Sequence, residues 1–197
     1  MVLKSLAENV GETCNLAVAD RFNIVCLDRV KTHWPLGIQL PIGTKVPLHC
    51  TASGKMYLSS LWIDKLGRLL KALDFAPQTK RSMTEPDVLQ KELTLSRERG
   101  YTADNQEFLD GMAAIAVGDY DDQERLLTTL SIHAPMQRQD IDDLVKNFDL
   151  LQEAARRLEI LAQSWRAMIS RRASSRPKPR DPFPTSLSPL APSHPPA

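Results

Sequence analysis

The chain has 197 residues, of which 42% are hydrophobic and 25% charged, and its formal net charge at pH 7 is +1. These values are typical of a globular protein with one domain and extra segments, and they give no electrostatic indication of a nucleic-acid or membrane surface. No apolar run reaches the roughly 18 residues of a membrane span, and the first residues lack a signal-peptide core, so we expect a cytoplasmic protein.

The first part of the chain predicts a helix, a hairpin and two further helices. Residues 1–10 place apolar side chains at intervals of three and four, as in a helix. Residues 13–20 and 23–31 are apolar-rich segments separated by a short polar turn, and they predict a β-hairpin. Residues 34–43 are punctuated by proline and glycine and predict a loop with a short strand. From 52 to about 72 the period is helical, and we divide this segment into two helices near residue 60.

Turn signals and a second hairpin dominate the middle of the chain. Thr84 resembles a helix N-cap because Pro86 follows in the first turn, and the helix that it starts should end at Gly100. Residues 111–135 contain two apolar runs around an acidic turn, which is the clearest hairpin pattern in the sequence.

The C-terminal part changes from periodic to irregular. Residues 139–169 carry one long apolar stripe and predict a single amphipathic helix. Residues 169–197 hold most of the prolines and cannot bury enough surface to order the chain, so we expect a disordered, Pro-rich tail. Two hairpins with helices between and after them predict an α+β fold, with an antiparallel sheet flanked by helices.

The segment LHCTASGKMYL, residues 48–58, combines small residues with a Gly-Lys pair. A phosphate-binding loop needs glycine where His49 stands and a hydroxyl where Met56 stands, so a nucleotide site is not supported. A helix start with small residues can hold a carboxylate on its first amides. The alternative is a simple capped helix start, with Thr51 or Ser53 as the cap. In either case we expect Lys55 to point toward solvent.

Other chemistry has weak support in the sequence. The three cysteines have no paired spacing and are expected to be free thiols, and the four histidines lack metal-ligand spacing. No nucleophile motif is present, so we predict no catalytic residue, no metal and no cofactor. Asp104 and Glu107 stand where a strand should begin, and a carboxylate there could accept a ligand hydroxyl or satisfy a turn.

Several segments together resemble one protein family. They are GETCNLAVAD, IVCLDRV, PIGTKVPLHCTASGKMYL, RERGYTADNQEFLDGMAAIAV and LLTTLSIHAPMQR, in the order and spacing of the effector-binding domain of IclR-family bacterial transcription regulators. The resemblance covers about residues 1–165. It implies a GAF-like fold, a pocket for a small carboxylate metabolite, and assembly into dimers or tetramers.

The same resemblance implies which residues contact the effector. The small-residue helix start supplies backbone groups for the carboxylate, and Ser131 and His133 share one face of a strand. His133 replaces a small hydroxyl and Ala114 replaces a cysteine found in some members, so larger or aromatic carboxylates join the expected effectors. The implied positions are Leu36, Ala52, Ser53, Gly54, Asp104, Ala114, Ser131 and His133.

The resemblance also suggests a domain organisation. Residues 1–12 match the end of a linker helix, 13–168 the effector domain and 169–197 the tail. The winged-helix module that precedes this domain in the family is not in the sequence, so we expect DNA contact only through a module absent from this chain. Two alternatives stay open: a stand-alone module that hetero-oligomerises with full-length paralogues, and a small pocket enzyme that uses Ser131, His133 and Asp104.

Overall fold

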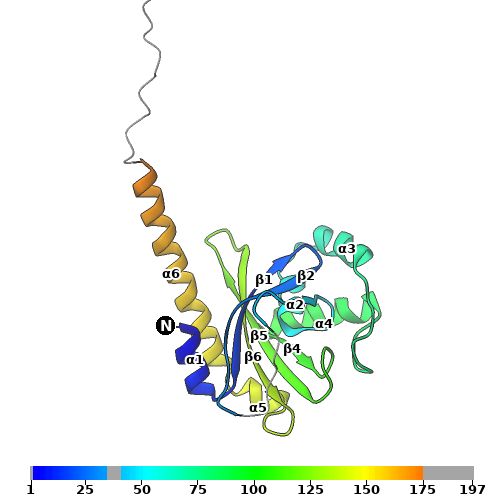
Figure 1. Cartoon of the computed structure of the whole chain (residues 1–197). Helices are drawn as coiled ribbons and strands as arrows, with labels where there is room; N and C mark the ends of the chain where they lie inside the picture. The colour runs from blue at the N-terminus through cyan, green and yellow to red at the C-terminus, as the bar shows by residue number, and fades with distance from the viewer. Residues whose placement is uncertain (1, 35–40, 175–197) are drawn as a thin grey trace, which may run out of the picture.

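A six-stranded antiparallel sheet forms the centre of the molecule (Figure 1). The computed structural model describes residues 2–34 and 41–174. The two predicted hairpins are present, and their inner strands pair with each other, which joins both hairpins into one sheet. In the order β3-β2-β1-β6-β5-β4, the strands are β1 (Thr13–Asp20), β2 (Asn23–Val30), β3 (Lys45–Pro47), β4 (Thr102–Asn105), β5 (Met112–Tyr120) and β6 (Leu126–Pro135).

Helices cover both faces of this sheet, which confirms the predicted α+β architecture (Figure 1). One face carries α1 (Val2–Val10), α5 (Ile141–Val145) and α6 (Phe148–Ser174). The other carries α2 (Ala52–Ser59), α3 (Ile63–Ala72) and α4 (Pro86–Arg99), with α2 directly against the strands.

Side-chain alternation along β5 and β6 gives the two faces different characters. Ile115 and Ile132 point to the α1 and α6 side, where they join the larger hydrophobic core. Their neighbours Ala114 and Ser131 lie on the opposite face, beneath α2. Because alanine and serine are small, α2 lies close to the strands. The same small side chains leave a space between the first turn of α2 and the sheet.

Gly54 is the point of closest approach between α2 and the segment that precedes it. A Cβ atom added here would lie 2.3 Å from the carbonyl oxygen of Leu48 and 2.5 Å from its Cα. Both are backbone atoms that cannot rotate away. The position therefore requires glycine for packing.

Three sequence predictions differ from the structure. The single helix expected over 139–169 is broken between α5 and α6, where Asn147 donates its side-chain amide to the carbonyl oxygen of Asp143 and favours a helix end. The N-cap of α4 is Glu85 and not Thr84, because a residue before proline is held extended. Helix α6 continues to Ser174, so the boundary expected at residue 168 lies inside it.

The remainder of the predicted tail, residues 175–197, lies outside the described residues. Within the described part of the chain, no helix is both long enough and apolar enough to cross a membrane.

Replacing Gly54 tests the close approach of α2. We expect Gly54→Ala to lower the free energy of unfolding by about 1–3 kcal/mol, the usual range for overpacking a core. The matched control is Gly67→Ala in α3, where an added Cβ meets nothing within 4 Å. That change should stabilise the protein by about 0.5–1 kcal/mol, because alanine is the better helix former. Urea unfolding of both variants measures the contrast, and equal effects would contradict the packing role of Gly54.

Candidate functional site

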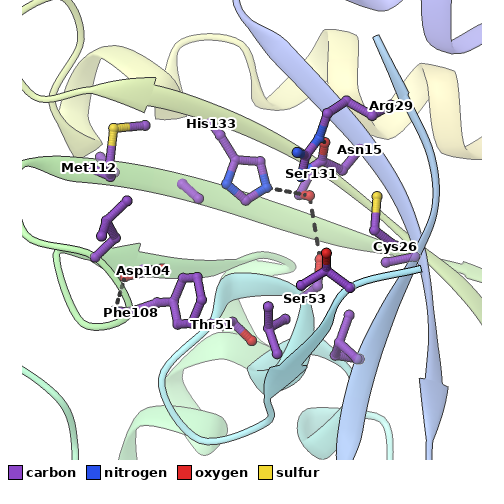
Figure 2. A pocket seen from close by; sticks show the side chains of 17 residues that line it. Asn15, Cys26, Arg29, Thr51, Ser53, Asp104, Phe108, Met112, Ser131 and His133 are labelled. Carbon is purple, nitrogen blue, oxygen red and sulfur yellow. Dashed lines mark hydrogen bonds between the residues drawn. The ribbon is translucent and has the colours of Figure 1, made fainter. Parts of the chain in front are cut away.

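A cavity opens between the start of α2, the sheet face beneath it and the turn that joins β4 to β5 (Figure 2). Its volume is about 620 Å³, including the space open to solvent at its mouth. This size is ordinary for a small-molecule pocket. The wall residues are Asn15, Ala17, Ile24, Cys26, Arg29, Thr44, Val46, Thr51, Ser53, Asp104, Phe108, Leu109, Met112, Ala113, Ala114, Ser131 and His133.

The N-terminus of α2 forms one edge of this cavity. Thr51 is the N-cap, and its Oγ1 accepts a hydrogen bond from the Gly54 amide at 3.1 Å. The amides of Ala52 and Ser53 have no hydrogen-bond acceptor in the described part of the chain. The first turn therefore combines the two readings that the sequence left open: it is a capped helix start, and it retains donors beside the cavity.

A chain of polar side chains leads from α2 to the sheet (Figure 2). Ser53 Oγ donates to Ser131 Oγ at 3.4 Å, and Ser131 Oγ shares a hydrogen bond of 2.9 Å with His133 Nε2. Burial, with a smaller contribution from the positive charge of Arg29, lowers the pKa of His133 to about 3. His133 is therefore a neutral hydrogen-bonding group near pH 7, with little capacity to act as a base.

Asp104 lines the cavity and also shapes the turn after β4. Its Oδ1 accepts hydrogen bonds from the amides of Glu107 at 2.8 Å and Phe108 at 3.3 Å. Burial, followed by the negative charge of Glu107, raises the pKa of Asp104 to about 7. The carboxyl group thus satisfies the turn and carries only part of a negative charge at neutral pH.

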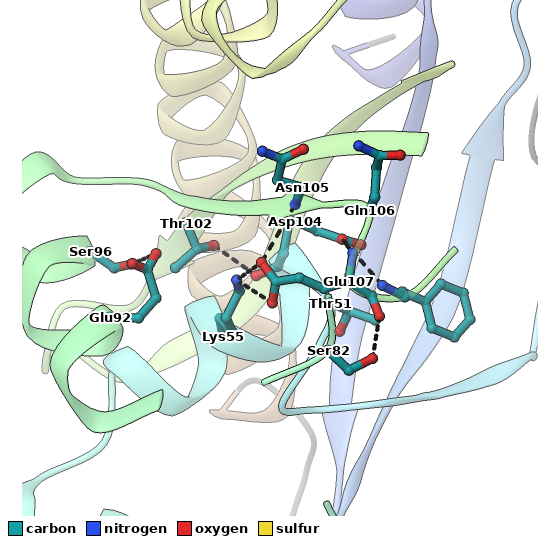
Figure 3. A network of polar contacts seen from close by, with 12 residues as sticks. Thr51, Lys55, Ser82, Glu92, Ser96, Thr102, Asp104, Asn105, Gln106 and Glu107 are labelled. Carbon is teal, nitrogen blue, oxygen red and sulfur yellow. Dashed lines mark hydrogen bonds and ion pairs between the residues drawn. The ribbon is translucent and has the colours of Figure 1, made fainter. Parts of the chain in front are cut away.

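Lys55 is fully buried, which corrects the expectation that it points toward solvent (Figure 3). Its Nζ lies 2.6 Å and 2.8 Å from the two carboxylate oxygens of Glu107. The side chain of Glu107 is also buried, with 8% exposed. The long lysine stem runs inward beneath the first turn of α2 and ends in an ion pair with the β4–β5 turn.

Further hydrogen bonds hold the same turn from outside (Figure 3). The carbonyl oxygen of Glu107 accepts from Ser82 Oγ at 2.6 Å and from Thr79 Oγ1 at 3.1 Å. On the inner side, Thr102 Oγ1 donates to the carbonyl oxygen of Ala52 at 2.7 Å. The turn and the start of α2, two walls of the cavity, are therefore joined by buried polar contacts.

Arg29 is a cavity residue that the sequence patterns do not indicate. Leu16 pairs with Asp28 while the next residue, Ala17, pairs with Cys26, so β2 contains a bulge. The extra residue reverses the side-chain alternation of β2 and brings Arg29 onto the cavity face. Strict alternation would have put Asp28 there, and no sequence signal marks the bulge.

The structure brings most of the predicted effector residues together. Ser53, Asp104, Ala114, Ser131 and His133 all line the cavity. Two of the predicted residues, Ala52 and Gly54, do not line the cavity. Ala52 is buried against Met56 and the alanines of β5. Gly54 packs against the segment that precedes α2, and its amide donates to the Thr51 cap. The predicted apolar wall residue, Leu36, lies outside the described residues.

The arrangement does not resemble a catalytic triad or a metal centre. The Asp104 carboxylate is engaged with the turn amides, and the low pKa of His133 makes it a weak base for Ser131. Within residues 2–34 and 41–174, no three side chains of the metal-binding types cluster together. The three cysteines, Cys14, Cys26 and Cys50, are buried free thiols.

Comparisons with known proteins give one consistent result. The family model described as bacterial transcriptional regulator IclR C-terminal matches residues 1–160. The probable transcriptional regulator SauR of Cupriavidus necator is 38% identical over 144 residues, which are 73% of this chain and 57% of that protein. The chain thus spans little more than half the length of this relative.

Solved structures agree with that match. The crystal structure of Thermotoga maritima IclR superposes with a TM-score of 0.75 at 30% identity, covering 80% of this chain and 66% of that one. The inducer-binding domain of a double mutant of PobR from Acinetobacter, solved with 3-hydroxybenzoic acid, superposes with a TM-score of 0.73 at 22% identity. That match covers 80% of this chain and 93% of that one, and it shows the shared fold.

Removing one partner of the buried ion pair should lower the free energy of unfolding much more than replacing both partners with apolar residues. We expect Lys55→Met to lower the free energy of unfolding by about 3–5 kcal/mol, because Glu107 is left as a buried charge without its partner. The double change Lys55→Met with Glu107→Leu should recover most of that loss. Lys146→Met, at an exposed pair with Asp143, is the control and should cost less than about 1 kcal/mol. Urea unfolding measures all three variants, and a double variant no more stable than Lys55→Met alone would contradict the pairing.

The raised pKa of Asp104 predicts a pH-dependent stability. The folded-state pKa of about 7 exceeds the ordinary value of 3.8, so the folded protein binds this proton more tightly than the unfolded chain does. The stabilisation is complete below about pH 4 and is lost as the pH rises through about 7. The free energy of unfolding of Asp104→Asn should therefore rise relative to that of the wild type between about pH 4 and pH 7. Above about pH 7 the difference between the two proteins should stay constant. Urea unfolding across this range measures that difference, and a flat curve would contradict the assignment.

Proposed function

Because the chain belongs to the IclR family of bacterial transcriptional regulators, we propose that residues 13–168 form a sensing domain whose cavity binds a small organic carboxylate. In this proposal the carboxylate approaches the first turn of α2, beside Ser53. The observation that carries it is the placement of unpaired helix amides at the edge of a cavity that is otherwise mainly apolar.

Two further features of the site support a bound acid. The hydroxyl groups of Ser53 and Ser131 and the neutral ring of His133 add hydrogen-bonding groups on one side of the cavity. The PobR inducer-binding domain was solved with an aromatic acid, and it shares this fold. A domain of the same architecture therefore accommodates a ligand of the proposed class.

Signalling requires that the ligand bind two conformations with different affinities. The cavity lies on one face of the sheet, and α1 and α6 lie on the other, packed against each other and against the strands. We propose that residues 1–12 are the end of a linker helix and that occupancy of the cavity is transmitted through the sheet to α1. The proposal includes a cytoplasmic homodimer or tetramer, with DNA contacted by a winged-helix module outside the domain described above.

Thermal denaturation with a panel of small carboxylates tests the pocket assignment. We expect at least one acid to raise the melting temperature, because a ligand that binds only the folded state stabilises it. Ser53→Trp should abolish this rise, since the indole fills the space beside the first turn of α2. The control is Ser164→Trp on the exposed surface of α6, which should leave the rise unchanged.

Circular dichroism shows whether Ser53→Trp retains the fold, and Ala114→Leu is a second variant that reduces the cavity from the sheet side. An acid whose effect survives both substitutions binds elsewhere, and the proposed pocket would then be wrong.

A further inference from the structure

We infer that Arg29 holds the acidic group of the ligand, and that the cavity therefore selects a monoanionic acid with an apolar body. The inference rests on the proposed function, since it names the ligand class of the same cavity. It adds a residue on β2 to a site proposed above from α2, β4, β5 and β6.

The position of Arg29 is fixed by the sheet. Its Nε donates to Oδ1 of Asn15 at 2.7 Å, and Asn15 is buried on the neighbouring strand. Asn15 pairs with Arg29 on one side and with Ser131 on the other, so these three residues form one row across β2, β1 and β6. The guanidinium group consequently lies on the same side of the cavity as Ser131 and Ser53 (Figure 2).

The charge balance of the wall favours a single negative charge on the ligand. The titratable residues among those that line the cavity are Cys26, Arg29, Asp104 and His133. Burial keeps the Cys26 thiol and the His133 ring neutral near pH 7, and Asp104 is at most partly ionised. Lys55 and Glu107, which lie behind the wall, neutralise each other. Arg29 is therefore the permanent charge of the wall, and a second negative charge on the ligand would be buried without a counter-ion.

The opposite side of the cavity defines the rest of the ligand. Phe108 and Met112 present apolar side chains there, across the cavity from Arg29 and Asn15 (Figure 2). An acid bound at Arg29 thus extends its body toward apolar surface. Planar carboxylates also match the two-pronged geometry of a guanidinium group, which a lysine ammonium lacks.

Calorimetric titration with matched acids and amides tests the role of Arg29. The probes are benzoate with benzamide and butyrate with butyramide, in which each pair differs in charge but hardly in shape. We expect the wild type to bind the acids at least about tenfold more tightly than the amides. Arg29→Gln should weaken acid binding by about tenfold or more, close to 1.4 kcal/mol, and should nearly abolish the preference for acids. Arg68→Gln, at an exposed position of α3, is the control and should change neither value.

The outcomes separate the two proposals. Acids that bind the wild type and Arg29→Gln equally well overturn the inference about Arg29 and leave the proposed function intact. A wild type that binds none of the acids overturns the proposed function, and this inference with it. If Arg29→Gln does not fold, Arg29→Lys replaces it, and retention of full acid affinity would count against a guanidinium-specific contact. A wild-type preference for succinate over monomethyl succinate would overturn the monoanion class without any variant.

Discussion

The buried contact between Lys55 and Glu107 is the constraint on which the cavity depends. It fixes the first turn of α2 to the turn between β4 and β5, two segments that are 52 positions apart in the chain. A buried ion pair adds little net stability compared with an apolar pair of similar volume, whereas separating its partners leaves each charge buried without compensation. Its contribution here is positional, because it sets where the helix amides stand relative to Asp104 and the apolar wall.

The remaining features of the site follow from that arrangement and from the sizes of the residues around it. Small side chains on β5 let α2 approach the sheet, and the absence of a side chain at Gly54 lets the first turn of α2 pack against the backbone of Leu48. Serines and a neutral histidine then fill the polar side of the space without introducing a competing charge. The opposite face of the same strands packs against α1 and α6, so a shift of the strands on one side must be accommodated on the other.

Periodicity and turn chemistry are enough to predict the two hairpins, the α2–α3 division and the C-terminal cap of α4 at Gly100, whose φ of 80° is natural only for glycine. The inward-facing pair on β6 also follows from simple alternation. The burial of Lys55 could not be predicted, because its partner Glu107 is distant in sequence and an isolated lysine is normally solvated. The same limit applies to Arg29, whose orientation depends on an irregular strand pairing, and to the break at Asn147, where an apolar stripe continues across two helices.

The bulge in β2 has an evolutionary consequence. Since side chains alternate strictly on either side of it, a strand with the same residues but regular pairing would turn Arg29 away from the cavity and present Asp28 in its place. Loss of the bulge, with no change of residue type, would thus invert the sign of the charge that the cavity offers to its ligand. Relatives with the same residues in this strand but a different pairing would then differ in the class of metabolite they sense, and the pairing of β2 would be a better guide to that difference than the residue identities.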